Sequence, residues 1–125
     1  MSQSFDAVAR LAGAFRRRGL GAGTRIALIG ANSAWHFLCH AAASWLHAVT
    51  VPLSPRLPSS ALASMCVRVG VTWAFVDESA SLHARALADA GIRTFPWDDL
   101  RSWTRHGDPI AGEPARCGAE LAAIL

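Results

Sequence analysis

Short apolar runs alternate along the chain with longer stretches in which apolar residues recur at helical spacing. The run from Arg25 to Ile29 is apolar after its first residue, as is typical of a strand buried on both faces of a parallel sheet. A stretch rich in small residues follows, from Ala34 to about Leu46, and then a second apolar run from Val49 to Leu53. Strand, helix and strand in this order predict a parallel βαβ unit.

The residues before this unit predict a helix that ends in a glycine-rich loop. Ser4 is the expected N-cap, and glycines at 19, 21 and 23 end the helix before the first strand. The apolar positions follow the i, i+3, i+4, i+7 spacing of one helix face: Val8, Leu11, Ala12 and Phe15.

The alternation continues after Leu53. We expect helices from Ser59 or Ser60 to about Val69 and from about Ala80 to Ala90, and strands at Thr72 to Val76 and Ile92 to Phe95. Residues 96–118 contain Gly, Pro and polar residues and predict an irregular excursion or linker. The last six residues, E-L-A-A-I-L, predict the beginning of a further strand.

Regular alternation of strands and helices with short turns predicts the α/β class. The expected architecture is a doubly wound, mostly parallel sheet flanked by helices. In such sheets ligands gather at the carboxyl ends of the strands, so the loops after the strands are the places to look for a site.

The composition indicates a piece of a larger protein. A hydrophobic fraction of 52% and a mean hydropathy of +0.26 are high for a free-standing domain of 125 residues. The longest apolar stretch, Phe37 to Leu53, is interrupted by polar residues and is too short to span a bilayer. The N-terminus lacks a basic region followed by an apolar core, so no secretory signal is predicted. We therefore expect no transmembrane segment, and apolar faces that another part of the protein covers.

The charges exclude some chemistry. All twelve basic residues are arginines, so no lysine is available for a Schiff base or a phosphate-binding loop. The net charge of +3 is spread widely, and the one run, Arg16-Arg17-Arg18, is expected to offset the dipole at the end of the first helix. A nucleic-acid surface would need more cations on one face, so no nucleic-acid partner is predicted.

The three cysteines, Cys39, Cys66 and Cys117, are far apart and form no C-x-x-C pair. An odd number without such spacing predicts buried thiols in a reducing cytoplasm.

The first loop after a strand, Gly30-Ala31-Asn32-Ser33, is where a dinucleotide-binding protein would carry its glycines. The G-x-G-x-x-G pattern is absent there, and Gly19, Gly21 and Gly23 precede the strand. This weakens the hypothesis of a dinucleotide-dependent oxidoreductase. We interpret residues 30–33 as a corner between strand and helix, with Asn32 or Ser33 as the helix cap.

Other candidate residues have structural interpretations. His36, Cys39 and His40 lie within about one turn, but H-E-x-x-H is absent because position 37 is Phe. G-x-S-x-G is absent too. The acidic pairs Asp77-Glu78 and Asp98-Asp99 suit helix N-termini.

The five tryptophans divide into two groups. Trp35, Trp45 and Trp73 are expected in the core or at a subdomain interface, whereas Trp97 and Trp103 fall in the irregular region, where they could face a partner.

The order of these segments resembles the N-terminal part of the adenylate-forming acyl-CoA synthetases, the AMP-binding enzymes. The resemblance covers nearly the whole chain, 1–125, as a partial AMP-binding N-terminal domain. It rests on V-A-R-L-A-G-A-F-R-R-R-G-L-G-A-G-T-R-I-A-L-I-G-A-N-S-A-W at 8–35, A-V-T-V-P-L-S-P-R-L-P at 48–58, T-W-A-F-V-D at 72–77 and E-L-A-A-I-L at 120–125.

The resemblance implies a parent enzyme that activates a carboxylic acid, expected to be a fatty acid, with ATP and Mg²⁺ to an acyl-adenylate and then transfers it to CoA. The family's Ser/Thr/Gly-rich phosphate loop would follow Leu125, so no catalytic, cofactor-binding or metal-binding residue is assigned within 1–125. The fragment is expected to be inactive alone and to bind no cofactor. Its expected partner is the remainder of the synthetase, in cis or as a split chain.

One alternative stays open. The chain could be a non-catalytic interaction or regulatory domain derived from the same fold, whose apolar content serves a protein partner.

Overall fold

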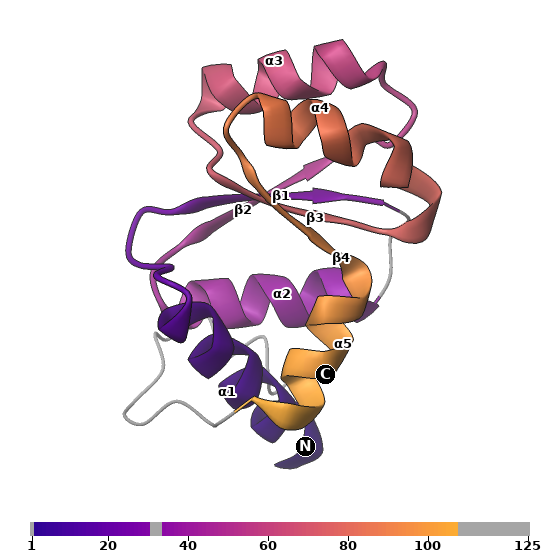
Figure 1. The fold of residues 1–125 in the computed structure, drawn as a ribbon. Helices are drawn as coiled ribbons and strands as arrows, with labels where there is room; N and C mark the ends of the chain where they lie inside the picture. The colour runs from indigo at the N-terminus through magenta and orange to yellow at the C-terminus, as the bar shows by residue number, and fades with distance from the viewer. Residues whose placement is uncertain (1, 31–33, 108–125) are drawn as a thin grey trace.

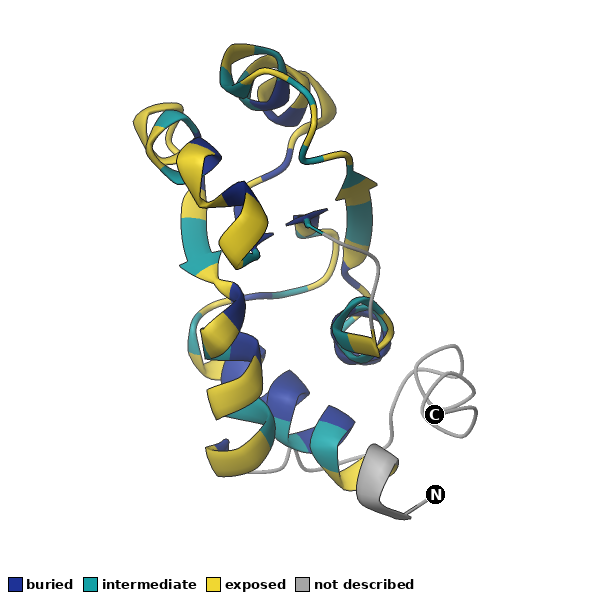
Figure 2. Ribbon diagram, turned by 90° about the vertical axis from the view of Figure 1, so that its right-hand side faces the viewer, coloured by how far each residue is buried: buried dark blue, intermediate teal, exposed yellow. Residues whose placement is uncertain are grey.

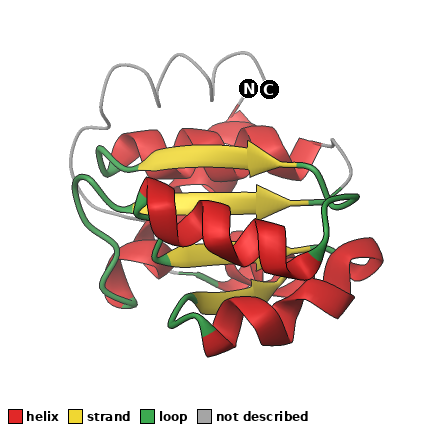
Figure 3. Cartoon of the chain, turned by 90° about the horizontal axis from the view of Figure 1, so that it is seen from above, coloured by secondary structure: helices red, strands yellow, loops and turns green. Residues whose placement is uncertain are grey.

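The computed structural model describes residues 2–30 and 34–107, and its centre is a four-stranded parallel sheet (Figure 1). The strands are β1 (Arg25–Ile29), β2 (Val49–Leu53), β3 (Trp73–Val76) and β4 (Arg93–Pro96), in the order β2-β1-β3-β4. All four run in one direction, so their carboxyl ends share one edge (Figure 3). The bounds of β1 and β2 are those predicted, and β3 and β4 each begin one residue later than expected.

Helices cover both faces of the sheet, as a doubly wound fold requires. One face carries α1 (Ser2–Arg17), α2 (Ala34–Trp45) and α5 (Trp97–His106). The other carries α3 (Ser59–Val69), the 3₁₀ helix η1 (Glu78–His83) and α4 (Ala84–Asp89). The predicted fold class is therefore confirmed.

Alternation along the strands supplies two cores, one to each layer of helices. Ile26 and Leu28 join the core under α1, α2 and α5, whereas Ala27 and Ile29 join the core under α3 and α4. Figure 2 shows the buried residues on the helix faces that turn toward the sheet, with exposed residues outside. The apolar run of β1 is thus explained by burial on both faces.

Rings from four elements pack together under the sheet. Phe75 of β3 lies 5.7 Å from the ring of Phe15, 5.4 Å from that of Phe95 and 5.9 Å from that of Trp103. Trp73 joins this aromatic cluster 5.0 Å from Phe95. The cluster ties α1 and α5 to the two strands that they cover.

The prediction of an irregular segment over 96–118 is wrong for its first part, because Trp97–His106 forms α5. Asp98 and Asp99 occupy its first turn, where carboxylates favour a helix. Buried Trp97 and Leu100 turn one face toward the core, with Trp103 packed against it, so Trp97 and Trp103 do not form an outer partner surface. The rest of the segment, and E-L-A-A-I-L, lie outside the described residues.

The end of α5 is locked against α1. Arg10 donates from its guanidinium to the carbonyl of Gly107 at 3.0 Å. A Cβ on Gly107 would lie 2.5 Å from the carbonyl oxygen of Arg10 and 2.6 Å from that of Trp103. Only glycine fits here, because both neighbours are backbone atoms.

The helix predicted from Ala80 to Ala90 is instead η1 followed by α4. Serines in this segment compete for backbone hydrogen bonds, which favours a tighter turn over a regular α-helix. His83, which is 2% exposed, also fixes the segment by bonding to Ser59 Oγ at 2.6 Å and to the Pro55 carbonyl at 2.8 Å. A smaller correction concerns α1, which begins at Ser2, so Ser4 lies inside it and is not its cap.

Cys39 and Cys66 are fully buried and form no disulfide, as predicted, while Cys117 lies outside the described residues. Burial raises the pKa of both thiols, so little reactive thiolate forms. We expect a thiol reagent to leave Cys39 and Cys66 unmodified in the folded protein and to label both of them in urea. The measurement is mass spectrometry of Cys117→Ser, and rapid labelling of that variant without urea would contradict the burial.

Candidate functional site

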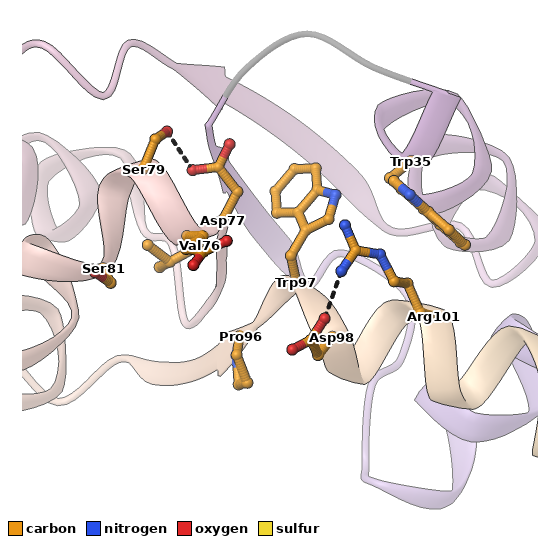
Figure 4. Close-up of a pocket in the computed structure, with 10 residues that line it drawn as sticks. Trp35, Val76, Asp77, Ser79, Ser81, Pro96, Trp97, Asp98 and Arg101 are labelled. Carbon is orange, nitrogen blue, oxygen red and sulfur yellow. Dashed lines mark hydrogen bonds and ion pairs between the residues drawn. The ribbon is translucent and has the colours of Figure 1, made fainter.

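A cleft of about 970 Å³ opens at the carboxyl edge of the sheet, beyond the ends of β3 and β4 (Figure 4). Open α/β sheets bind ligands at the carboxyl edge, where the strand order reverses. Here it reverses at β1, because β2 lies on one side of β1 and β3 lies on the other. The position of the cleft matches such a site. The cleft is lined by Trp35, Val76, Asp77, Glu78, Ser79, Ser81, Pro96, Trp97, Asp98 and Arg101.

Asp77 directly follows β3 and caps η1, as the sequence predicts for the Asp77-Glu78 pair. Its Oδ1 accepts from the Ala80 amide at 3.1 Å and from the Ser79 hydroxyl at 2.6 Å. Gly30, directly after β1, lies so close that a Cβ there would be 2.4 Å from the Asp77 carboxylate carbon. The carboxylate therefore caps η1 and packs closely against the loop after β1, a structural role.

The opposite wall of the cleft carries an ion pair that the sequence analysis did not anticipate. Arg101 Nη1 lies 2.5 Å from Asp98 Oδ1, with side-chain exposures of 50% and 81%, and the guanidinium carbon is 5.9 Å from the Trp35 ring (Figure 4). A pair this exposed contributes about 0–1 kcal/mol. The three-residue spacing of Asp98 and Arg101 would have indicated it, had the helix been recognised.

His36, on the first turn of α2, packs against this cleft through Trp97. The centres of the two rings are 5.2 Å apart, and their planes meet at 63° in an edge-to-face arrangement. Partial burial lowers the pKa of His36, and the negative charge of Asp77 opposes that shift. The ring is therefore predominantly neutral at pH 7.

This pKa shift predicts a pH effect with a definite sign. Because folding lowers the pKa of His36, the unfolded chain binds the proton more readily, and the free energy of unfolding falls as the pH drops below about 6.5. We expect His36→Gln to remove that part of the pH dependence. In NMR titrations, Asp77→Asn should lower the pKa of His36 further; an unchanged or higher pKa would contradict the assigned coupling.

A second hollow of about 300 Å³ lies beside the edge strand β2. Its lining includes His36, Phe37 and His40, and His40 Nδ1 is 2.6 Å from Thr50 Oγ1. Cys39 lies in the core and not with these histidines. Within residues 2–30 and 34–107, no three potential ligands gather to hold a metal ion.

Most charged side chains that line the cleft are acidic. Asp77, Glu78 and Asp98 would repel phosphates, and the guanidinium of Arg101 is already paired with Asp98. The corner at Gly30 is described only at its first residue, because 31–33 lie outside the described part, as does the expected cap at Asn32 or Ser33.

The Ser59–His83 pair, which the sequence analysis missed, lies outside this lining. Its buried histidine uses both ring nitrogens to hold loops together, so we assign it a structural role.

No helix of the described residues is long and apolar enough to cross a membrane.

Comparisons with known proteins agree with this fold. The family model described as AMP-binding enzyme matches residues 2–108. Among solved structures, apo MatB from Rhodopseudomonas palustris is similar at 19% identity and a TM-score of 0.74, over 90% of this chain and 24% of MatB. No curated protein sequence matches the chain.

Two Mycobacterium tuberculosis structures are similar as well. The inhibitor-bound N-terminal domain of FACL13 matches at 22% identity and a TM-score of 0.77, over 90% of this chain and 30% of that one. A fatty acyl CoA synthetase matches at 24% identity and a TM-score of 0.78, over 90% and 24%. At these identities the similarity shows a shared fold. The chain spans about a quarter to a third of the length of these proteins.

Proposed function

The chain belongs to the family of AMP-binding enzymes, and we propose that it forms the N-terminal part of an AMP-forming acid–CoA ligase. The observation that carries the proposal is the family match over 2–108, which covers all of the described helices and strands. Similarity of the fold to acyl-CoA synthetases supports it.

The proposed parent enzyme activates a carboxylic acid with ATP and Mg²⁺ and passes the acyl group to CoA. One similar structure, MatB, is described as ATP bound, and another similar protein is a fatty acyl CoA synthetase. From the ATP-bound structure we infer that the parent enzyme uses ATP. From the fatty acyl CoA synthetase we infer that its substrate is a fatty acid.

Within that enzyme, residues 1–125 supply a supporting sheet and leave the chemistry to other residues. The cleft at the carboxyl edge carries carboxylates where phosphates would need cations, and the chain contains no lysine. In this proposal the sites for ATP, Mg²⁺ and CoA belong to parts of the parent enzyme outside 1–125. The partner of the fragment is the remainder of the synthetase, in cis or as a split chain, in the cytoplasm.

Two measurements test this proposal. The first is the DNA directly downstream of codon 125, where we expect an in-frame Ser/Thr/Gly-rich loop followed by lysine. The second compares the 125-residue polypeptide with that polypeptide joined to, or mixed with, the downstream product. Carboxylate-dependent exchange of pyrophosphate into ATP is expected only when both parts are present. Micromolar ATP affinity or pyrophosphate release by residues 1–125 alone would overturn the supporting role.

Exposed apolar side chains favour a second candidate, a non-catalytic interaction domain. Phe37, Val49 and Leu82 are 54%, 50% and 69% exposed. Such a domain would bind a protein partner through these residues. In that case no carboxylic acid would stimulate the exchange of pyrophosphate into ATP, even when the downstream product is present. Both candidates require a partner that covers the exposed apolar side chains. If the 125-residue chain is a folded monomer that binds no hydrophobic dye, this would argue against both the synthetase fragment and the interaction domain.

A further inference from the structure

Arginines that are distant in the sequence gather at the amino edge of the sheet, opposite the cleft. In a parallel sheet the covering helices run back against the strands, so α1 and α3 end where the strands begin (Figure 1). We define the arginine edge as five exposed or half-exposed residues at or beside these helix ends and at the first residues of β1 and β4: Arg16, Arg18, Arg25, Arg68 and Arg93. The sequence shows only the run at 16–18, and the fold adds the other three.

Hydrogen bonds show that this edge is one continuous surface. Arg25 donates from its guanidinium to the Val69 carbonyl at the end of α3. The Thr72 amide donates to the Arg25 carbonyl at 3.1 Å, and the Arg93 amide donates to the Thr72 carbonyl at 2.9 Å. Arg93 Nη1 then donates to the Arg18 carbonyl, at 2.6 Å, at the end of α1.

Capping of helix ends accounts for only part of this charge. A helix C-terminus carries about half a negative charge, so the ends of α1, α2, α3 and α4 together offset about two of the five positive charges. Carbonyl contacts use few of the five N–H donors of each guanidinium. Within the described residues, the ion pairs of Asp6, Asp89 and Asp98 are with other arginines. Counted over the described part of the chain, a surplus of about three charges therefore remains.

Two of the guanidiniums are held in place by rings beneath them. Arg18 lies 4.1 Å from the ring centre of Trp103, and Arg93 lies 4.7 Å from that of Trp73. Side chains fixed in this way lose less conformational freedom when they bind an anion. Arg also pairs with phosphate oxygens through two parallel N–H groups.

Exposed apolar groups accompany the cations. Val67 and Val69 flank Arg68 on the last turn of α3, with exposed fractions of 59% and 39%. Apolar side chains beside cations suit the boundary between headgroups and acyl chains of a bilayer. Nucleic acid is less well matched, because Trp73 is 3% exposed and offers no open ring for base stacking.

We propose that the arginine edge is a peripheral docking surface for an anionic lipid bilayer, with the arginines on lipid phosphates and Val67 and Val69 at the headgroup boundary. The proposal is independent of the ligase function, because it concerns the edge opposite the cleft.

The test is sedimentation of the full chain with vesicles of phosphatidylcholine alone or mixed with phosphatidylserine. We expect binding to the mixed vesicles only, weakened by added salt. Arg16→Gln/Arg68→Gln should lower the partition coefficient about 25-fold, at about fivefold per arginine. Arg56→Gln/Arg85→Gln removes the same net charge elsewhere and should change it less than about threefold. Val67→Ser/Val69→Ser should weaken binding even in high salt.

Several outcomes would overturn the proposal. They are no binding to the mixed vesicles, equal losses for the two arginine pairs, or displacement by inorganic phosphate at matched ionic strength. Tighter binding to single-stranded RNA or to an acidic polypeptide than to vesicles would assign the edge to that partner instead. Circular dichroism and urea midpoints of each variant verify that the fold is unchanged.

Discussion

Replacing Phe75 with alanine is expected to lower the free energy of unfolding by about 3–5 kcal/mol. Phe75 is fully buried in β3, with rings of α1, α5 and β4 around it. These neighbours belong to three elements that cannot all move inward, so a cavity should remain under the sheet. Since domains are commonly stable by about 5–15 kcal/mol, the loss is a large share of the total. Urea unfolding followed by circular dichroism measures it.

Phe37→Ala is the matched control. Phe37 is 54% exposed on α2, so the same change of residue type should alter the free energy of unfolding by less than about 0.5 kcal/mol. Equal losses at Phe37 and Phe75 would mean that the aromatic cluster is not the core of this layer.

The second large effect is expected from Gly30→Ala, at about 2–4 kcal/mol. A Cβ at position 30 would lie 2.4 Å from the Asp77 carboxylate carbon and 2.9 Å from its Cβ. Overpacking of this kind costs about 1–3 kcal/mol. Moving the Asp77 side chain away would also break its cap on η1, which contributes about 1 kcal/mol. Urea unfolding measures the sum.

Two further variants isolate the cause. Gly21→Ala should be nearly neutral, because no atom lies within 4 Å of the Cβ that it adds. In an Asp77→Ala background, Gly30→Ala should cost clearly less than it does alone, since the carboxylate is gone. Additive losses in the double variant would show that the contact between Gly30 and Asp77 is not the source.

The strands and most helices could be predicted because each is specified locally. β1 is apolar on both faces, and α3 ends at Gly70, whose φ of 84° is one that glycine readily adopts. Asp77 and its neighbours carry the signature of a helix start. The order of the strands in the sheet has no such local signal, because it depends on which apolar surfaces meet.

The helix α5 was missed although its sequence carries the pattern. Trp97, Leu100 and Trp103 are spaced three apart, acidic residues begin the segment, and Arg105 and His106 end it. The helical pattern consists of only three large apolar side chains. The Gly, Pro and polar residues near them favour an irregular segment, so the pattern alone did not predict a helix. Contacts such as that of Gly30 with Asp77 could not be predicted at all, because they require β1 and β3 to be neighbours.

The contact between Arg10 and Gly107 also bears on how the chain is made. The helix α1 is synthesised well before α5, so nearly all of the described chain has to follow it before α5 can cover it. At roughly 5–20 residues per second, its apolar face stays uncovered on that side for several seconds of synthesis. Chaperone binding to nascent chains is therefore expected to fall sharply once Trp103 has cleared the exit tunnel.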